Sequence, residues 1–157
     1  MQVGILQFFG WRDRSVPLQS VYQSALDRFV IMDQPGYDAV WLAPVNATDD
    51  PSAISYAVTD YRAVRADYGT QADFKALAAE AHAHGLKVVI DVVHNHTSKG
   101  HPWFKAHPER YMRNPDGTPQ FYFDWAHLIN LDYGQAAVRR EMTDAFEFNI
   151  DAAWNVV

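Results

Sequence analysis

Residues 87–104 read KVVIDVVHNHTSKGHPWF, and this stretch decides the fold that we predict. Its first seven residues, 87–93, are rich in β-branched apolar side chains, which is typical of a strand buried in a parallel sheet. Ligand sites of parallel α/β folds lie at the carboxyl ends of the strands. The stretch therefore places four polar residues on the functional edge of the sheet: Asp91, His94, Asn95 and His96.

Strand and helix patterns alternate along the rest of the chain. Strands are predicted over residues 3–9, 38–43, 87–93 and 150–157. A first helix is predicted over residues 17–33, and a third one begins near residues 132–135. Thr70 and Asp73 have the spacing of a capping box and open the second helix, which Gly85 closes.

Apolar residues at helical spacing give the last two helices one buried face each. We expect these faces to comprise Phe74, Leu77, Ala78 and Ala81, and then Val138, Met142, Ala145 and Phe146. The alternation predicts an α/β fold, with about four parallel strands and three helices forming half of a (βα)8 barrel of the TIM type. Residues 1–157 are expected to form one incomplete barrel domain.

Two connections that follow strands are long, residues 44–69 and 94–133, and loops of this length are usually functional. They hold half of the chain's aromatic residues, including Tyr56, Tyr122 and Trp125. These rings either pack on one another or line a cleft.

Composition excludes several classes of protein. A net charge of −6 argues against nucleic acid or an anionic membrane as partner, and the absence of cysteine rules out disulfides and thiolate metal sites. The first residues do not resemble a signal peptide, and no apolar run reaches the ~18 residues of a membrane span. We therefore expect a cytoplasmic protein.

The DVVHNH motif at residues 91–96 has three chemical interpretations. Asp91 and His96 could hydrogen-bond a polyhydroxylated ligand while Asn95 orders the loop or binds a cation such as calcium. His94 and His96, facing the same way if the extended run continues, could chelate a transition metal with a carboxylate. The group could also simply satisfy backbone polar atoms where strand meets loop.

Residues 38–148 resemble the α-amylase family of glycoside hydrolases. The likeness rests on GYDAVWLAPV (36–45), on the block that runs from SYAVTDYR through DVVHNHTSKGHPWF (55–104), and on HLINLDYGQAAVRREM (127–142). The resemblance implies a (βα)8 barrel that binds α-glucan or oligosaccharide. It implies that His96 contacts sugar hydroxyls, that Tyr56 is the aromatic platform beneath that sugar, and that Asp91 supports the site.

The same resemblance implies that Asn95 is a calcium ligand in members that bind calcium. Asn130 stands where such members often carry an aspartate, which weakens the case for calcium. Ser55 and Ala57 flank Tyr56 in place of the commoner Gly-Tyr-Asp pattern.

Residues 1–43 are similar instead to the opening of luciferase-like flavin monooxygenases, which are also (βα)8 barrels. Pro44, Val45 and Asn46 stand where that family carries Glu-His-His, so we do not expect flavin to bind. The sequence thus predicts a junction of two barrel families near residues 38–45, by natural fusion, assembly artefact or engineering.

Retaining glycosidases need two carboxyl groups about 5–5.5 Å apart. In the family's pattern, residues 150–157 would place Trp154 at an arginine and Val156 at the nucleophilic aspartate, so we expect the catalytic carboxylates to be missing. An apolar strand at residues 150–157 would expose an edge, which favours a homo-oligomer or poor solubility.

The sequence therefore favours an α-amylase-type catalytic-domain fragment that binds carbohydrate. Three alternatives stay open: a flavin-dependent oxidoreductase fragment, a metal-dependent hydrolase using His94 and His96, and a chimeric or engineered scaffold without activity.

Overall fold

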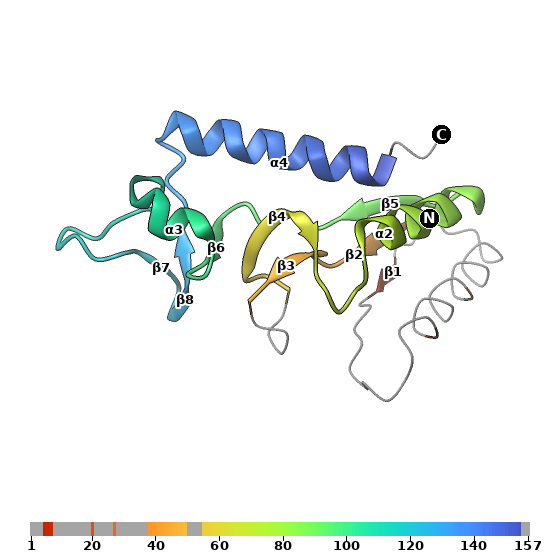
Figure 1. The fold of residues 1–157 in the computed structure, drawn as a ribbon, viewed down its shortest axis with the longest axis horizontal. Coiled ribbons are helices and arrows are strands. Elements are labelled where there is room, and N and C mark those ends of the chain that lie inside the picture. Colours follow the sequence, from red (N-terminus) through yellow and green to blue (C-terminus); the bar gives the residue numbers. More distant parts are fainter. Residues whose placement is uncertain (1–4, 8–19, 21–26, 28–37, 50–54, 155–157) are drawn as a thin grey trace. The chain divides into compact units, whose positions relative to one another are not determined.

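The computed structural model describes residues 5–7, 20, 27, 38–49 and 55–154 (Figure 1). The chain divides into two compact units, each described by itself below. The first comprises residues 1–45, 64–91 and 150–157, and the second comprises residues 46–63 and 92–149. The predicted helix over residues 17–33 lies outside the described residues apart from Ser20 and Asp27, which are both helical.

The first unit contains a parallel sheet with the order β1-β2-β5, formed by Ile5–Gln7, Ala39–Leu42 and Lys87–Ile90 (Figure 1). Val40 pairs with Ile5 on one side and with Val88 on the other, so the three strands are in register. The parallel arrangement predicted from the apolar runs is therefore confirmed for the described strands.

Helix α2 (Gln71–Ala83) covers one face of this sheet, and its ends follow the local sequence. The Thr70 hydroxyl accepts from the Asp73 N–H at 3.2 Å, and the Asp73 carboxylate accepts from the Thr70 N–H at 2.7 Å, which completes the predicted capping box. Gly85 follows the helix with φ +71°, a conformation that favours glycine. The predicted apolar face is confirmed, since it packs with strand residues in the first core cluster: Val40, Leu42, Val45, Phe74, Leu77, Ala78, Ala81, Leu86 and Val88.

The second unit contains antiparallel strands, a short helix and part of a long helix. Strands β3 (Asn46–Thr48) and β4 (Val58–Val64) form one sheet, with Val64 itself in the first unit. A second sheet has the order β6-β8-β7, from His96–Ser98, Trp125–Asn130 and Phe121–Tyr122. Helix α3 (Pro102–Ala106) and the 3₁₀ turn η1 (Pro108–Arg110) lie between β6 and β7. The two long connections therefore carry secondary structure of their own.

Strand β5 is shorter than predicted. It ends at Ile90 rather than residue 93, and the chain re-enters a sheet only at His96, where β6 pairs antiparallel with β8. The predicted strand over residues 87–93 is therefore too long by three residues, and the Val93 carbonyl is bound by the phenol of Tyr61.

Helix α4 (Ala136–Trp154) corrects the last predicted strand. Residues 150–154 continue this helix and residues 155–157 lie outside the described part of the chain, so the strand prediction over 150–154 is wrong. The periodicity of a short apolar run is the same in a strand and in a buried helix, so it cannot tell the two apart. Because α4 has already formed before residue 150, extending it costs less than starting a new element. Val138, Met142 and Ala145 are buried as predicted, while Asp151 is exposed on the helix.

The described sheet of the first unit thus contains three parallel strands rather than the predicted four. Among the described residues, no helix is both long enough and apolar enough to cross a membrane.

The face of the sheet away from α2 carries two large exposed apolar side chains. Trp41 and Val89 pair across β2 and β5, and each is 48% exposed. We expect this face to drive self-association at micromolar concentration because adjacent exposed apolar side chains favour burial. Light scattering should give more than the monomer mass, and Trp41→Glu should shift the population towards monomer. Met112→Glu, at an exposed position in the second unit, is the control; a monodisperse monomer of the parent would contradict this expectation.

Candidate functional site

His96 is the most constrained of the predicted site residues. It begins β6, is 4% exposed, and its Nε2 lies 3.2 Å from the Tyr56 carbonyl oxygen. A carbonyl partner requires the tautomer in which Nε2–H donates, and Nδ1 then accepts from the Asn95 amide at 3.4 Å. Burial lowers the pKa of His96, and the contact with the Tyr56 carbonyl opposes that shift in part. The imidazole is therefore a neutral group near pH 7.

Tyr56 comes from the other long connection and packs at the edge of the second core cluster. That cluster contains Val58, Tyr61, Val93, Tyr111, Ile129, Leu131, Val138, Met142 and Ala145. The hydrogen bond between the Tyr56 carbonyl and the His96 ring joins residues 40 positions apart in the chain. The structure thus brings together two residues that the sequence assigned to one site.

Asp91 lies in the first unit, directly after β5, where its N–H donates to the Leu42 carbonyl at 2.9 Å. Its backbone therefore extends the pairing of β2 with β5 by one hydrogen bond. Because His96 and Tyr56 belong to the second unit, Asp91 is not placed relative to them.

His94 has surroundings that differ from those of His96. It is exposed, its ring meets Phe146 edge-on at a centroid distance of 6.4 Å, and its carbonyl accepts from the Tyr133 hydroxyl at 2.6 Å. Within the described residues, no group of three or more His, Cys, Asp or Glu side chains is arranged to hold a metal ion. The geometry therefore gives no support to a transition-metal centre built on His94 and His96.

Asn95 and Asn130 form a hydrogen-bonded pair of side-chain amides. Asn95 Nδ2 donates to Asn130 Oδ1 at 3.2 Å, while Asn130 Nδ2 donates to Gln120 Oε1 at 3.3 Å and to the Phe121 carbonyl at 3.2 Å. Calcium prefers six to eight oxygen ligands, several of them carboxylates. The nearby carboxylate of Asp132 instead accepts from Gly134 N–H and the Gln135 amide. This neutral donor set does not fit the calcium site that the family resemblance implied for Asn95.

Tyr61 holds the His96 segment in place, a role that the sequence did not reveal. Its buried hydroxyl donates to the Val93 carbonyl at 2.8 Å and lies 3.3 Å from the His96 carbonyl. Burial, aided by the neighbouring Tyr133 and Tyr111, raises the pKa of Tyr61 far above its ordinary value, so it stays a neutral donor. In the sequence, the position of this aromatic residue between the charged Asp60 and Arg62 was the signal that could have identified it as buried.

His101 is a second buried histidine that sequence reasoning missed. Its Nδ1 accepts from the Trp103 N–H at 3.1 Å at the start of α3, and its ring lies 4.6 Å from Trp103 and 5.7 Å from Tyr61. Burial lowers the pKa of His101 to about 4; the positive charge of Arg110 acts in the same direction, and Asp60 opposes it.

Asp49, Ser98 and Gly100 tie the end of β3 to the end of β6. The Ser98 hydroxyl lies 2.9 Å and 3.0 Å from the two Asp49 oxygens and accepts from the Gly100 N–H at 3.0 Å. A Cβ at position 100 would stand 2.0 Å from Asp49 Oδ2, so the close approach requires glycine.

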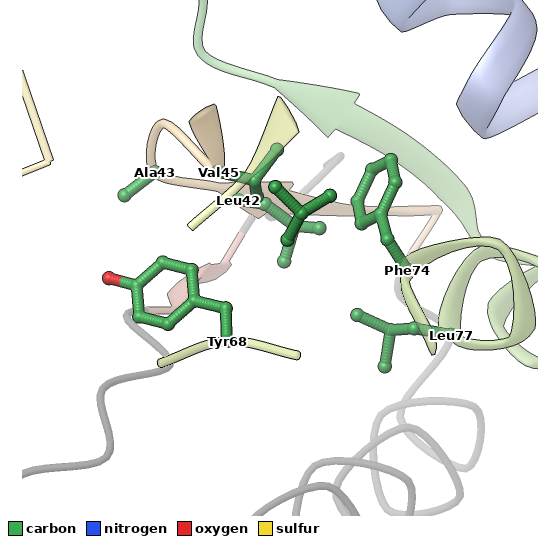
Figure 2. A pocket seen from close by; sticks show the side chains of 7 residues that line it. Leu42, Ala43, Val45, Tyr68, Phe74 and Leu77 are labelled. Atoms are coloured by element: carbon green, nitrogen blue, oxygen red, sulfur yellow. The ribbon is translucent and has the colours of Figure 1, made fainter. Parts of the chain in front are cut away.

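A pocket in the first unit does not contain any predicted site residue. Figure 2 shows Phe74 and Leu77 projecting from α2 towards Leu42 and Val45, with the Tyr68 ring on another side of the opening. Its lining is almost wholly apolar and comprises Leu42, Ala43, Val45, Val64, Tyr68, Phe74 and Leu77. It is a gap between sheet and helix, and the Tyr68 hydroxyl is the one side-chain polar group in its lining.

Gly100→Ala is expected to lower the free energy of unfolding by about 1–2 kcal/mol, because the new methyl group displaces Asp49 from the Ser98 hydroxyl. Urea titration measures the change. In an Asp49→Ala background the same substitution should cost clearly less. Equal costs in both backgrounds would mean that the clash with Asp49 is not the cause.

His101 should make the fold sensitive to acid. Its folded pKa of about 4 lies below the ordinary 6.5, so the unfolded chain binds a proton that the folded chain excludes. Stability is then lost as pH falls from about 6.5 to about 4. His101→Asn keeps an acceptor for the Trp103 N–H but cannot titrate, so urea titrations across this range should give a flatter pH dependence. A slope equal to that of the parent would disprove the assignment to His101.

Comparison with known proteins shows which protein family this chain is similar to. Residues 26–128 match the family model described as "Alpha amylase, catalytic domain". The chain is 32% identical to the alpha-amylase MalA of Haloarcula japonica over 171 aligned residues, which cover 99% of this chain and 25% of that protein. It is 46% identical to an oligo-1,6-glucosidase of Parageobacillus thermoglucosidasius over 73% of this chain and 21% of that protein.

The solved structure of an alpha-amylase from Lactobacillus plantarum superimposes with a TM-score of 0.77 at 32% identity, over 92% of this chain and 35% of that one. The chain therefore spans about a quarter of the length of the two relatives and about a third of the solved structure. The family match begins at residue 26, upstream of the junction predicted near residues 38–45, and these matches support neither the flavin-enzyme resemblance nor a chimera. With a family model matched over more than half of its residues, the chain belongs to the alpha-amylase family of glycoside hydrolases and corresponds to part of the catalytic domain.

Proposed function

We propose that this chain provides sugar-binding loops of a glycoside hydrolase that acts on α-glucosidic bonds. The observation that carries the proposal is the hydrogen bond between the His96 ring and the Tyr56 carbonyl, in a chain that matches the α-amylase catalytic domain. This hydrogen bond joins His96, whose imidazole suits sugar hydroxyls, to Tyr56, whose aromatic ring suits the apolar face of a pyranose.

The hydrogen bonds of His96 suggest how a sugar is received. Nε2–H is committed to the Tyr56 carbonyl at 3.2 Å, whereas the contact of Nδ1 with the Asn95 amide, at 3.4 Å, is long for a hydrogen bond. A sugar hydroxyl can replace the Asn95 amide as donor to Nδ1. Since the imidazole is buried and neutral, it acts as a positioning acceptor and not as a general acid.

Two further groups complete the proposal. Asp91, directly after β5, is proposed to keep the supporting role that the family resemblance implies. The nucleophile and the acid/base carboxyl group, about 5–5.5 Å apart in a retaining enzyme, are proposed to come from regions that the relatives have and residues 1–157 do not include. Hydrolysis or glucosyl transfer is then an activity of the whole protein.

The ligand class follows from the relatives. The names alpha-amylase and oligo-1,6-glucosidase indicate α-linked glucose oligomers for those proteins, and we extend this class to the present chain. Flavin chemistry has no comparable observation in its favour among the described residues.

Titration with maltotriose, followed by NMR or calorimetry, tests this proposal. His96→Ala should weaken binding about tenfold or more, which corresponds to the loss of one hydrogen bond in a buried site. His94→Ala, an exposed histidine two positions away, is the matched control and should leave the affinity within about twofold. Equal affinities for the parent and His96→Ala would remove the site assignment.

A further inference from the structure

The turn at residues 114–117 holds the one Asp-Gly pair of the sequence, Asp116 and Gly117. The Gly117 N–H closes the turn by donating to the Asn114 carbonyl at 2.9 Å. Its first, second and fourth residues, Asn, Pro and Gly, are those that β-turns favour at these positions. Asp116 and Gly117 are both exposed, so water reaches the peptide bond between them.

An aspartate followed by glycine can rearrange its own backbone. The Gly117 nitrogen attacks Cγ of the Asp116 carboxyl group, a C–N bond forms, and the N–H proton and the carboxyl OH leave together as water. Water then opens the ring at the main-chain carbonyl of Asp116, and the chain afterwards runs through the side chain as isoaspartate. Glycine hinders this attack least, and a Cβ at position 117 would meet no atom within 4 Å, so the surroundings of the nitrogen are open.

Thr118 holds the carboxylate that would react. Asp116 Oδ1 accepts from the Thr118 hydroxyl at 2.6 Å and from the Thr118 N–H at 2.9 Å, so it is tied to the residue beyond Gly117. The hydroxyl oxygen is itself oriented by Asn114 Nδ2, which donates to it at 3.0 Å. The bonds from the Thr118 side chain and backbone also lower the pKa of Asp116 and keep it ionised. An ionised carboxylate resists attack because it has no OH group to release.

The backbone of the turn restrains the other reactant. The Gly117 nitrogen must give up its proton before it attacks, and that N–H is bound to the Asn114 carbonyl. The Gly117 carbonyl accepts from the Arg113 guanidinium at 3.0 Å, and the Asn114 N–H donates to the Thr118 carbonyl at 2.9 Å. The folded turn therefore separates two groups that the unfolded chain would let meet.

We propose that Asp116 is a site of spontaneous isoaspartate formation and that the Thr118 hydroxyl guards it. The product has the mass of the parent, because one water leaves and one enters, but its main chain is longer by a methylene group. That extra length disrupts the turn that the hydrogen bond between Asn114 and Thr118 closes. The guard thus determines how long this exposed turn keeps its original backbone.

The test is incubation of the whole chain at neutral pH, with isoaspartate at position 116 measured by electron-transfer fragmentation in a mass spectrometer. Thr118→Val removes the hydroxyl and keeps the side-chain shape and the N–H. It should raise the rate of isoaspartate formation about fivefold or more, the change expected when one hydrogen bond to a charged group is lost. Thr118→Ser keeps the hydroxyl and should stay within about twofold of the parent.

Two further variants and the unfolded parent complete the experiment. Asn114→Ala loosens the turn but leaves the Thr118 hydroxyl on Asp116, so its rate should stay close to that of the parent. Asp116→Glu should give no product, because its longer side chain forms the ring poorly. The parent in concentrated urea should react faster than the folded parent, since unfolding removes both restraints.

Each contrary result has one meaning. Equal rates for the folded parent and Thr118→Val overturn the guard, and so do equal rates for the folded and the unfolded parent. Equal acceleration by Thr118→Val and Asn114→Ala assigns the effect to general loosening of the turn and overturns the role of the hydroxyl. Unfolded parent without isoaspartate at position 116 overturns the site itself.

Discussion

The second unit depends on the buried side chain and backbone of Tyr61. Its hydroxyl donates to the Val93 carbonyl, and its own carbonyl accepts from the side-chain amides of Asn46 at 2.9 Å and Asn149 at 3.0 Å. One residue of β4 thereby joins β3, the segment before β6 and helix α4. A buried hydroxyl or amide without a partner costs a few kcal/mol, so these polar groups constrain the chain more tightly than apolar contacts of similar area.

This constraint explains how the chain leaves one kind of sheet and enters another. Strand β5 ends at Ile90, and the Asp91 N–H adds one more hydrogen bond to the Leu42 carbonyl of β2. The Tyr61 hydroxyl then satisfies the Val93 carbonyl. His96 then pairs with Asn130 in an antiparallel sheet. The imidazole is consequently fixed by its strand, by the Tyr56 carbonyl and by the Tyr122 ring, which is the kind of rigid support that a binding residue requires.

Several polar residues around the candidate site are neutral. His96 and His101 have lowered pKa values, Tyr61 and Tyr111 have raised ones, and burial is the main cause in each case. Asn95 and Asn130 bind each other where a cation site would need carboxylates. These neutral groups offer hydrogen bonds and aromatic contacts to hydroxyl groups. The chain spans about a quarter of the length of its two curated relatives.

The sequence alone determined those features that depend on neighbouring residues. The capping box at Thr70, the apolar face of α2 and the parallel strands at 39–42 and 87–90 follow local rules. Motifs predicted His96 and Tyr56 as members of one site, and the two residues are hydrogen-bonded in the structure. Only the tertiary structure decided that residues 150–154 are helical, that β6 pairs with a strand more than 25 positions away, and that Tyr61 contacts both the His101 ring and the Val93 carbonyl. Local patterns record which side chains prefer burial. They do not record which distant carbonyl or ring will be the partner, because that choice depends on three-dimensional packing that brings separate segments together.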